Sequence, residues 1–382
     1  MALKLGRRGQ VPPFIAMDVL RAANERAAAG ADVLHLEVGQ PSTPAPAAVL
    51  AAARTALGAE TLGYTDALGL PALREAIAAH YRDAYGVAVE PARVVVTTGS
   101  SGAFLLAFLA AFDPGDRVAM AAPGYPAYRN ILTALDLVPV ELPAGPAERY
   151  QMTLELLRSH AGRLDGLIVA SPANPTGTMI APDELAALAR YCRDMGIRFV
   201  SDEIYHGIVY GARAATALAT SAEAIVVNSF SKYFSMTGWR LGWMVVPPDM
   251  LRAVECLAQN LYISPPALSQ HAALAAFGCR AELDANVARY AANRALLLAE
   301  LPKAGFTRFA PADGAFYLYA DVAHLTNDSP EFCRRMLREI GVACTPGIDF
   351  DPARGHASLR ISFAGSTEAM EEAARRLKSW RR

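Results

Sequence analysis

Short apolar segments alternate with longer Ala- and Leu-rich stretches through most of the chain. The apolar segments predict seven strands, at residues 94–98, 117–121, 137–141, 167–170, 198–201, 224–228 and 241–246. Helices are expected between them, for example over residues 103–112 and 183–195. Strands without a polar face are typical of mostly parallel sheets that helices cover on both sides. The pattern therefore predicts an α/β unit with a mostly parallel seven-stranded sheet.

The pattern is less regular toward the C-terminus. A long helix is expected over residues 282–301 and a second helix over 329–340, with strands at 314–319 and 358–363. Fewer and less evenly alternating elements predict a smaller α+β domain. We therefore expect a large domain at residues 44–277. Residues 1–43 and 278–382 are expected to form an N-terminal arm and a small C-terminal domain that pack together.

The longest uncharged run, residues 94–112, approaches the ~20 residues that a membrane helix needs. The sequence TTGSSG interrupts this run with hydroxyl groups and glycines, and what remains is too short to span a bilayer. The basic N-terminus lacks the apolar core of a signal peptide. The run is therefore expected to be a buried strand followed by a buried helix.

Composition and charge exclude several classes of protein. Lys and Arg number 36 against 37 Asp and Glu, for a net charge of −1, which argues against a basic nucleic-acid binder. A chain that is 53% hydrophobic and 19% charged has a folding composition and not a disordered one. The five cysteines are widely spaced without a Cys-x-x-Cys pair, which argues against a metal site and a disulfide framework. A cytoplasmic protein that touches neither membrane nor nucleic acid is expected.

Polar residues gather at the ends of five predicted strands. Their sequences are Gly99-Ser-Ser-Gly102, Pro123-Gly-Tyr125, Ser171-Pro-Ala-Asn174-Pro-Thr-Gly177, Ser201-Asp202-Glu-Ile-Tyr205 and Ser229-Phe-Ser231-Lys232. In an open α/β sheet, ligands bind beyond the carboxyl ends of the strands. Hydroxyl groups, an amide, a carboxylate and a lysine are thus expected to meet at one edge of the sheet.

The segment Gly99-Ser100-Ser101-Gly102 follows a strand and opens an apolar helix. Its backbone N–H groups and the helix dipole would form a phosphate-binding site, although similar loops are common without a ligand. It lacks the lysine of a G-x-x-x-x-G-K-[ST] loop and the third glycine of G-x-G-x-x-G, so a nucleotide site is weakly supported.

Two charged residues stand out by their surroundings. Asp202 follows an apolar stretch directly, where a carboxylate is costly unless it meets a cation or a hydrogen-bond donor. Lys232 is flanked by aromatic and small residues and not by other charges. Most lysines are solvated, but one in this setting is a candidate for a lowered pKa and imine chemistry.

These motifs together resemble the class I/II aminotransferases, which are pyridoxal-phosphate enzymes of fold type I. The resemblance runs from Gly39-Gln-Pro to Arg360 and rests on order and spacing, including an arginine eight residues after Lys232. It implies that Lys232 forms the internal aldimine and moves the proton between substrate and cofactor. Asp202 would pair with the pyridinium nitrogen and keep it protonated.

The resemblance also implies how the rest of the cofactor is held. Asn174 and Tyr205 would donate hydrogen bonds to the ring oxygen, and Tyr125 would stack on the ring. The phosphate would be bound by four serines and one arginine: Ser100, Ser101, Ser229, Ser231 and Arg240.

Three further positions are expected to act on substrate or partner subunit. By resemblance, Arg360 would bind the substrate carboxylate, together with Asn174, and Gly39 would lie near that carboxylate. Tyr64 would cross a two-fold dimer interface to the phosphate of the other subunit, which implies a homodimer with shared sites. The chain departs from many relatives in reading Gln40-Pro41 after Gly39, where those relatives carry an acidic and an aromatic residue.

The resemblance implies transfer of an amino group from an L-amino acid to 2-oxoglutarate or pyruvate through a pyridoxamine phosphate intermediate. Phe14, Ile15 and Tyr64 could form an apolar wall, which favours a neutral or aromatic donor over aspartate. The same residues are compatible with β-elimination of a sulfur amino acid, as in C–S lyases of this fold. A ligand-sensing regulator is disfavoured because such proteins carry an added DNA-binding domain.

Overall fold

A seven-stranded sheet forms the centre of the larger part of the molecule in a computed structural model that describes residues 3–380. Its strand order is β2-β8-β7-β6-β5-β3-β4, and only β8 runs antiparallel to its neighbours. The strands are β2 (Val94–Thr97), β3 (Arg117–Ala122), β4 (Val138–Pro143), β5 (Gly166–Ala170), β6 (Arg198–Asp202), β7 (Ile225–Ser229) and β8 (Gly242–Val245). The mostly parallel seven-stranded sheet predicted from the sequence is confirmed.

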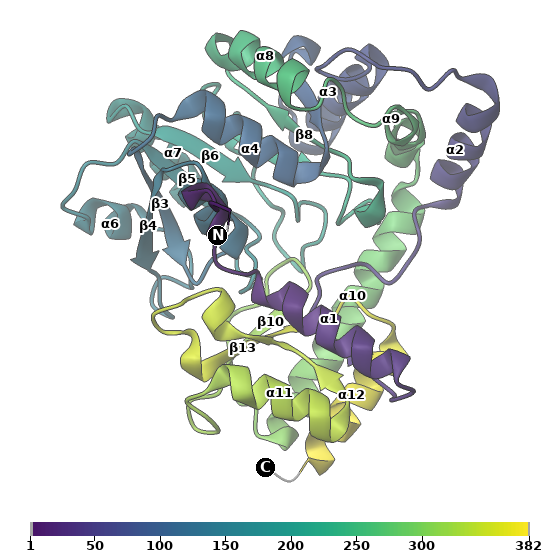
Figure 1. Ribbon diagram of the computed structural model, residues 1–382, viewed down its shortest axis with the longest axis vertical. Helices are drawn as coiled ribbons and strands as arrows, with labels where there is room; N and C mark the ends of the chain where they lie inside the picture. Colours follow the sequence, from purple (N-terminus) through teal and green to yellow (C-terminus); the bar gives the residue numbers. More distant parts are fainter. Residues whose placement is uncertain (1–2, 381–382) are drawn as a thin grey trace.

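Helices cover both faces of this sheet, as Figure 1 shows. Successive strand residues point to opposite faces, so Val94 and Val96 join one buried cluster and Val95 joins the other. On the first face lie α2 (Ala47–Ala59), α3 (Pro71–Tyr85), α6 (Leu154–Ser159), α7 (Pro182–Asp194) and α9 (Ala267–Ala273). On the second face lie α4 (Gly99–Ala111), α5 (Pro126–Ala134) and α8 (Leu251–Leu261).

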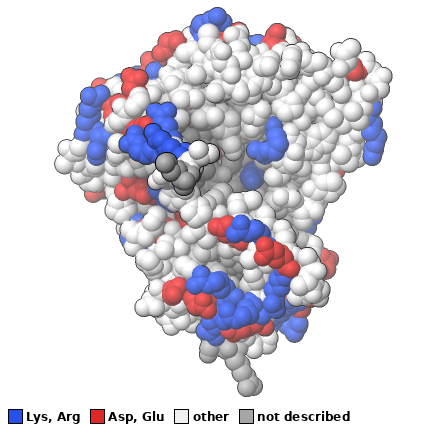
Figure 2. Space-filling view, viewed as in Figure 1, with Lys and Arg blue, Asp and Glu red and all other residues white. Residues whose placement is uncertain are grey.

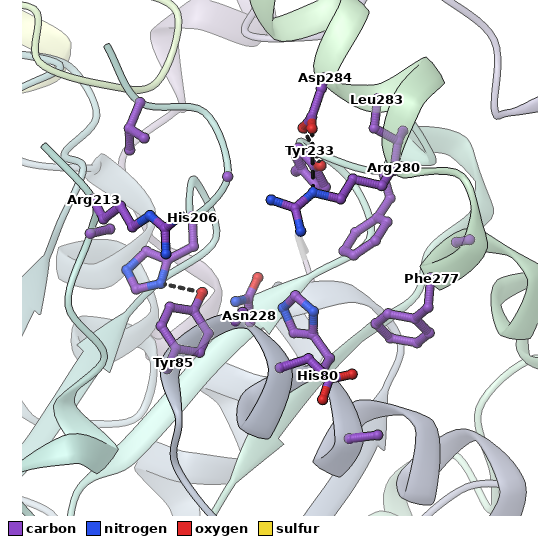
Figure 3. Close-up of a pocket in the computed structure, with 18 of the residues that line it drawn as sticks. His80, Tyr85, His206, Arg213, Asn228, Tyr233, Phe277, Arg280, Leu283 and Asp284 are labelled. Carbon is purple, nitrogen blue, oxygen red and sulfur yellow. Dashed lines mark hydrogen bonds and ion pairs between the residues drawn. The ribbon is translucent and has the colours of Figure 1, made fainter. Parts of the chain in front are cut away.

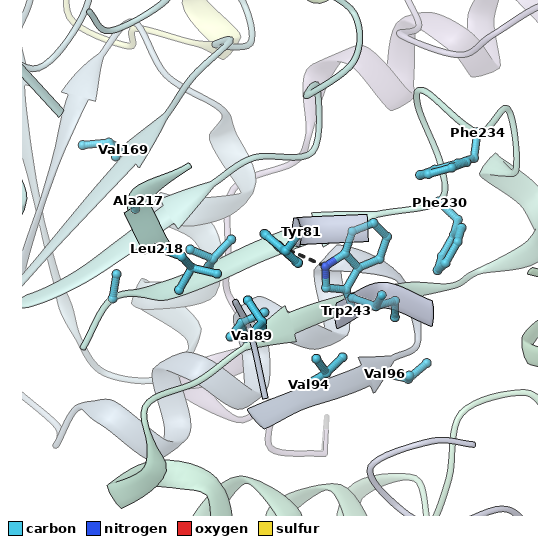
Figure 4. Close-up of a cluster of buried hydrophobic side chains, with 14 of the residues drawn as sticks. Tyr81, Val89, Val94, Val96, Val169, Ala217, Leu218, Phe230, Phe234 and Trp243 are labelled. Carbon is cyan, nitrogen blue, oxygen red and sulfur yellow. Dashed lines mark hydrogen bonds between the residues drawn. The ribbon is translucent and has the colours of Figure 1, made fainter. Parts of the chain in front are cut away.

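The core of the first face contains the largest fully buried side chain, Trp243 (Figure 4). Its indole Nε1 donates a hydrogen bond to the hydroxyl of Tyr81, 3.2 Å away, so the one polar atom of the ring is satisfied. Phe230 packs against the same indole with ring centroids 4.9 Å apart. This packing fixes the segment between β7 and β8, which carries Lys232.

A second sheet lies in the smaller part of the molecule, at the bottom of Figure 1. It is antiparallel, in the order β12-β13-β10-β9, and a further parallel pair joins β1 to β11. The strands are β1 (Leu34–His35), β9 (Arg308–Phe309), β10 (Tyr317–Asp321), β11 (Val342–Ala343), β12 (Thr345–Pro346) and β13 (Ser358–Ser362). The helices here are α1 (Ile15–Ala28), α10 (Arg280–Glu300), α11 (Ser329–Ile340) and α12 (Thr367–Ser379).

Two expectations need correction at this level. The helix expected from residue 103 begins at Gly99, so the Gly-Ser-Ser-Gly segment is the first turn of α4 and not a loop before it. The strand expected from residue 314 begins at Tyr317, because Gly314 pairs with Val209 in an isolated bridge outside the sheet and Ala315 has a φ of +56°, which is not a strand conformation. The division into domains at 44–277 stays a prediction.

The distribution of surface charge and the state of the cysteines agree with what the composition predicts. Figure 2 shows Lys and Arg side chains interspersed with Asp and Glu on the face it draws. All five cysteines are free. Within residues 3–380, no helix combines the length and apolar character that a membrane span requires.

Candidate active site

The polar residues at the strand ends meet at one edge of the large sheet. Strands β2, β3, β5, β6 and β7 all run in the same direction, because β8 is antiparallel to both β2 and β7. Asp202 is the last residue of β6 and Ser229 is the last residue of β7. The convergence expected from a parallel sheet is therefore observed.

Lys232 lies three residues after β7 and is partly buried. Its Nζ donates a hydrogen bond to the carbonyl oxygen of Gly39 at 2.8 Å and lies 5.9 Å from the ring centroid of Tyr205. The pKa of Lys232 is lowered to about 8, chiefly by burial and also by the positive charges of Arg360 and Arg240. The negative charge of Asp202 opposes this shift. The amine is thus held close to its point of half-protonation at physiological pH.

Asp202 is buried at the end of β6. It accepts hydrogen bonds from the hydroxyl of Tyr128 and, at 3.1 Å, from the backbone N–H of Ile204. Burial raises the pKa of Asp202 to about 6, while these two hydrogen bonds and Lys232 act in the opposite direction. A carboxylate that is buried and still ionised at neutral pH is suited to a cationic partner.

The first turn of α4 and the segment after β7 form a group of hydrogen-bond donors. The Ser229 and Ser231 hydroxyl oxygens lie 2.7 Å apart. Gly99 has a φ of +74°, and a Cβ there would lie 2.6 Å from Nη2 of Arg240, so the guanidinium lies against the start of α4. Ser100 is half-buried and Ser101 is exposed in the same turn. A helix N-terminus with serines and an arginine is an anion-binding arrangement.

Arg360 lies on β13 of the smaller sheet, and its side chain is fully buried. Its Nη1 donates to Oδ1 of Asn174 at 2.7 Å, and its Nη2 donates to the Glu37 carbonyl oxygen. The guanidinium also lies over the rings of Tyr317 and Phe350, 4.4 and 4.7 Å from their centroids. The Nε atom is buried without a partner in the described part of the chain.

Tyr205 and Tyr317 connect the two sheets. Their hydroxyl oxygens lie 2.7 Å apart, and burial raises the pKa of both. A Cβ on Gly39 would lie 1.6 Å from the Tyr317 hydroxyl, so only glycine fits there. The side chain that excludes a larger residue at position 39 is therefore Tyr317.

Tyr125 directly precedes α5 and lies near Asp202, Arg240 and Arg360, and the region between these residues is called the cleft below. Burial raises the pKa of Tyr125 to about 12, which keeps the hydroxyl protonated. Its ring packs edge-on against Phe14 at 5.7 Å and against Tyr128 at 5.2 Å. Phe14 of the N-terminal arm thus reaches the same cleft.

Three contributing residues were missed in the sequence analysis. Tyr128 holds Asp202, Tyr317 holds Tyr205, and Phe350 packs on Arg360. Tyr128 follows Tyr125 by three residues at the start of a helix, and that spacing could have placed both on one face. For Tyr317 and Phe350 no sequence signal existed, because their contacts depend on how the two sheets meet.

Tyr64 does not join the cleft in a single chain. Its side chain is 82% exposed, and the neighbouring Thr65 N–H bonds to the hydroxyl of Ser264. The described residues contain no cluster of His, Cys, Asp and Glu suited to a metal ion.

Comparisons with known proteins agree with this geometry. Residues 31–377 match the family model for aminotransferase class I and II. The chain is 56% identical to valine–pyruvate aminotransferase of Mycobacterium tuberculosis, over 100% of this chain and 99% of that protein. An aminotransferase crystal structure from M. tuberculosis superposes with a TM-score of 0.97 at 56% identity, over 99% of both chains. Aspartate aminotransferase from Thermus thermophilus with maleate superposes with a TM-score of 0.94 at 33% identity, also over 99% of both chains.

The residues that match the family model begin just after α1 and end within α12. They include every strand end described above. The relatives reported above are named as aminotransferases. The fold is the one found in these enzymes. The chain therefore belongs to the class I and II aminotransferases, and it is an enzyme that transfers amino groups.

Proposed function

We propose that this enzyme uses pyridoxal 5′-phosphate, bound at the strand ends, to move the amino group of a neutral L-amino acid to pyruvate. The observation that carries the proposal is the meeting of Lys232, Asp202 and Arg360 in one cleft. Lys232 and Asp202 influence each other's pKa, and Arg360 also acts on Lys232. An amine, a buried carboxylate and a guanidinium are the groups that this cofactor and an amino-acid carboxylate require.

The donor set supports this choice of cofactor. Ser100, Ser101, Ser229, Ser231 and Arg240 would hold the phosphate at the N-terminus of α4, where Gly99 leaves room for the Arg240 guanidinium. Asp202 would pair with the ring nitrogen, with its carboxylate held in place by Tyr128. When bound, pyridoxal phosphate supplies an electron-accepting ring that delocalises negative charge from the substrate Cα.

Side chains around the ring would orient it. Tyr205 and Asn174 would donate hydrogen bonds to the ring oxygen. Tyr125 would cover one ring face, and its position is supported by edge-on contacts with Phe14 and Tyr128. The buried walls around Tyr125 would also exclude water from the reacting atoms.

Lys232 would move the proton. With a pKa near 8, its amine can both accept a proton from the substrate Cα and return one at neutral pH. Gly39 would hold the amine in position through its carbonyl oxygen, 2.8 Å from Nζ. Arg360 would bind the substrate carboxylate through its planar guanidinium, which Tyr317 and Phe350 hold flat between them.

Two observations support a neutral donor and pyruvate as acceptor. The M. tuberculosis relative named valine–pyruvate aminotransferase shares 56% of its residues over the whole chain. The N-terminal arm also brings an apolar ring, that of Phe14, to the wall of the cleft beside Tyr125. An apolar wall favours binding of an aliphatic side chain over a charged one.

We also propose that the active unit is a two-fold homodimer. The exposed apolar side chains include Leu57, Tyr64, Leu261 and Ile263, and Thr65 is hydrogen-bonded to Ser264. These residues from α2, the Tyr64 segment and the end of α8 would form the contact. Tyr64 would then reach the phosphate of the partner subunit.

A matrix of amino donors against oxo-acid acceptors tests the substrate proposal. Valine, alanine, phenylalanine and aspartate are each assayed with pyruvate and 2-oxoglutarate on the purified enzyme. We expect kcat/KM to be higher for the neutral donors than for aspartate, with pyruvate as a productive acceptor. Aspartate far ahead of the others, or no turnover with pyruvate, would contradict the proposal. Pyruvate release from cysteine without any acceptor would instead indicate β-elimination.

A further inference from the structure

One cavity of the described chain lies apart from the catalytic cleft. Its volume is about 600 Å³, within the range of about 300–1,000 Å³ that is typical of small-molecule sites. It lies between the C-terminal half of α3, the start of α10 and the segment after β6 (Figure 3). None of the residues to which a cofactor or substrate role is assigned above lines it.

Two arginines reach toward this cavity from opposite sides, as Figure 3 shows. Arg213 belongs to the segment after β6, and it forms no hydrogen bond or ion pair with any residue among 3–380. Arg280, the first residue of α10, contacts Asp284 through Nε at 3.4 Å. That contact leaves the two terminal nitrogens of Arg280 available to an anion.

The acidic residues at the cavity already have partners. Asp284 accepts a hydrogen bond from the Tyr233 hydroxyl at 2.6 Å in addition to its contact with Arg280. Oδ1 of Asp83 lies 3.4 Å from Nε of Arg82, a residue that does not line the cavity. Among the charged groups of the lining, the guanidinium of Arg213 and the two terminal nitrogens of Arg280 therefore remain without a partner among residues 3–380.

The remaining wall is aromatic with a few polar atoms. His80 packs against Phe277 with ring centroids 5.5 Å apart and against Phe234 at 6.2 Å. Tyr85 bonds to Nδ1 of His206 at 2.8 Å. Flat rings beside guanidinium groups match a flat apolar molecule that carries a carboxylate.

Three lining residues are direct neighbours of catalytic residues in the chain. His206 follows Tyr205, and Tyr233 follows Lys232. Asn228 precedes Ser229, and Oδ1 of Asn228 accepts a hydrogen bond from the backbone N–H of Ser229 at 2.7 Å. In three separate backbone segments, one residue therefore lies at the cleft and its sequence neighbour lines the cavity. A ligand in the cavity would thus change the position of all three segments.

We propose that this cavity is a second ligand site, which binds a small aromatic carboxylate at Arg213 and Arg280 and thereby changes the turnover rate at Lys232. The binding claim is independent of the catalytic assignment. The effect on turnover rests on the proposed function. The carboxylate pairs with the arginines, and the apolar body lies against Phe277, His80 and Tyr85.

Binding is tested by calorimetric titration of the full-length, cofactor-loaded enzyme with indole-3-acetate. We expect one cavity site per chain, with affinity at least tenfold lower in Arg280→Gln, and no cavity binding in Ala79→Phe, which fills the space beside His80. Arg252→Gln is the matched control, because Arg252 lies on α8 in a similar ion pair with Glu255. Thermal unfolding of each variant checks that it is folded.

A probe that binds the catalytic cleft would give a different pattern. Arg360→Lys would then remove binding, while Arg280→Gln and Ala79→Phe would not affect it. That result, or no binding at millimolar indole-3-acetate, would overturn the proposed site. Binding that survives Arg360→Lys and is lost in the cavity variants supports it.

The turnover claim is tested by measuring kcat at saturating amino acid with and without indole-3-acetate. We expect kcat to change at least twofold in the wild type and to stay unchanged in Arg280→Gln. Binding without any change in kcat would overturn the coupling. An enzyme with no aminotransferase activity toward any donor would overturn the proposed function, while the titration would still decide on the cavity.

Discussion

The side-chain amine of Lys232 is hydrogen-bonded to the carbonyl oxygen of Gly39, 193 positions away in the sequence. Gly39 belongs to the N-terminal segment that follows β1, and Lys232 to the turn after β7. Position 39 is also where a Cβ would collide with the Tyr317 hydroxyl. One glycine thus contacts the predicted catalytic amine and allows Tyr317 to approach.

Gly39→Ala should disrupt this arrangement. The added methyl group would lie within 2.5 Å of the Tyr317 ring carbon Cζ, so the ring must shift and its 2.7 Å contact with Tyr205 is lost. We expect kcat/KM to fall at least tenfold and the free energy of unfolding to fall by about 1–3 kcal/mol, as is usual for overpacking. Gly58→Ala on α2 is the control, since no atom lies within 4 Å of its added Cβ. Full activity in Gly39→Ala would contradict the packing described here.

The lowered pKa of Lys232 predicts how the cofactor-free protein recovers its cofactor. Only the neutral amine reacts with a carbonyl, and its fraction rises with pH until the pKa is passed. With a pKa of about 8, the rate of reconstitution by pyridoxal phosphate should rise about tenfold between pH 7 and pH 9 and then level off. A lysine with an ordinary pKa would give a rate that still rises above pH 10. Stopped-flow absorbance across this range distinguishes the two.

Asp202→Asn should show a stability change that depends on pH. Because burial raises the pKa of Asp202 to about 6, the folded carboxyl binds its proton more tightly than the unfolded one. This group therefore contributes less to stability as the pH rises from about 4 to 6. Relative to wild type, cofactor-free Asp202→Asn should gain about 1–3 kcal/mol of unfolding free energy between pH 4 and pH 8.

The control for this measurement is Asp183→Asn, at an exposed position on α7. It removes a carboxylate without removing a buried charge. Denaturant titration at both pH values gives the comparison. An equal shift in the two variants would show that burial of Asp202 is not the cause. The reconstituted Asp202→Asn enzyme should also lose activity, because its amide cannot replace a carboxylate beside a cation.

Arg360→Lys should reduce activity even though the charge is kept. The guanidinium donates to Asn174 and to the Glu37 carbonyl while lying flat against Tyr317. An ammonium group lacks this planar fork. We expect kcat/KM for the amino acid to fall about 100-fold, with most of the loss in KM. Arg375→Lys on α12, in an exposed pair with Glu372, should have no effect.

Much of the fold could be predicted because the sheet is buried on both faces. β5 and the first three residues of β7 are continuous apolar segments, and polar or turn residues follow each of them, so these signals are local. The strand ends could be placed together because parallel strands share one edge. The two-residue strands β9 and β12 could not be predicted, since no periodicity exists over two residues.

Part of the candidate site could also be predicted, because parallel strands share one edge. Asp202 is the last residue of β6 and Lys232 lies three residues after β7, so the topology brings them to one edge. Tyr317 reaches the cleft only because β10 pairs with β13 and the small sheet packs against the large one. The cavity at Arg280 is built from three distant segments with no shared motif, and nothing in the sequence indicated it.

The most direct test of the central claim is the identity of the lysine that binds the cofactor. The cofactor-loaded enzyme is reduced with borohydride, digested and analysed by peptide mass spectrometry. We predict a pyridoxyl phosphate modification on Lys232 at about one per chain, and none on Lys303 or Lys378. Modification of another lysine, or an unmodified Lys232 in an active enzyme, would contradict the account.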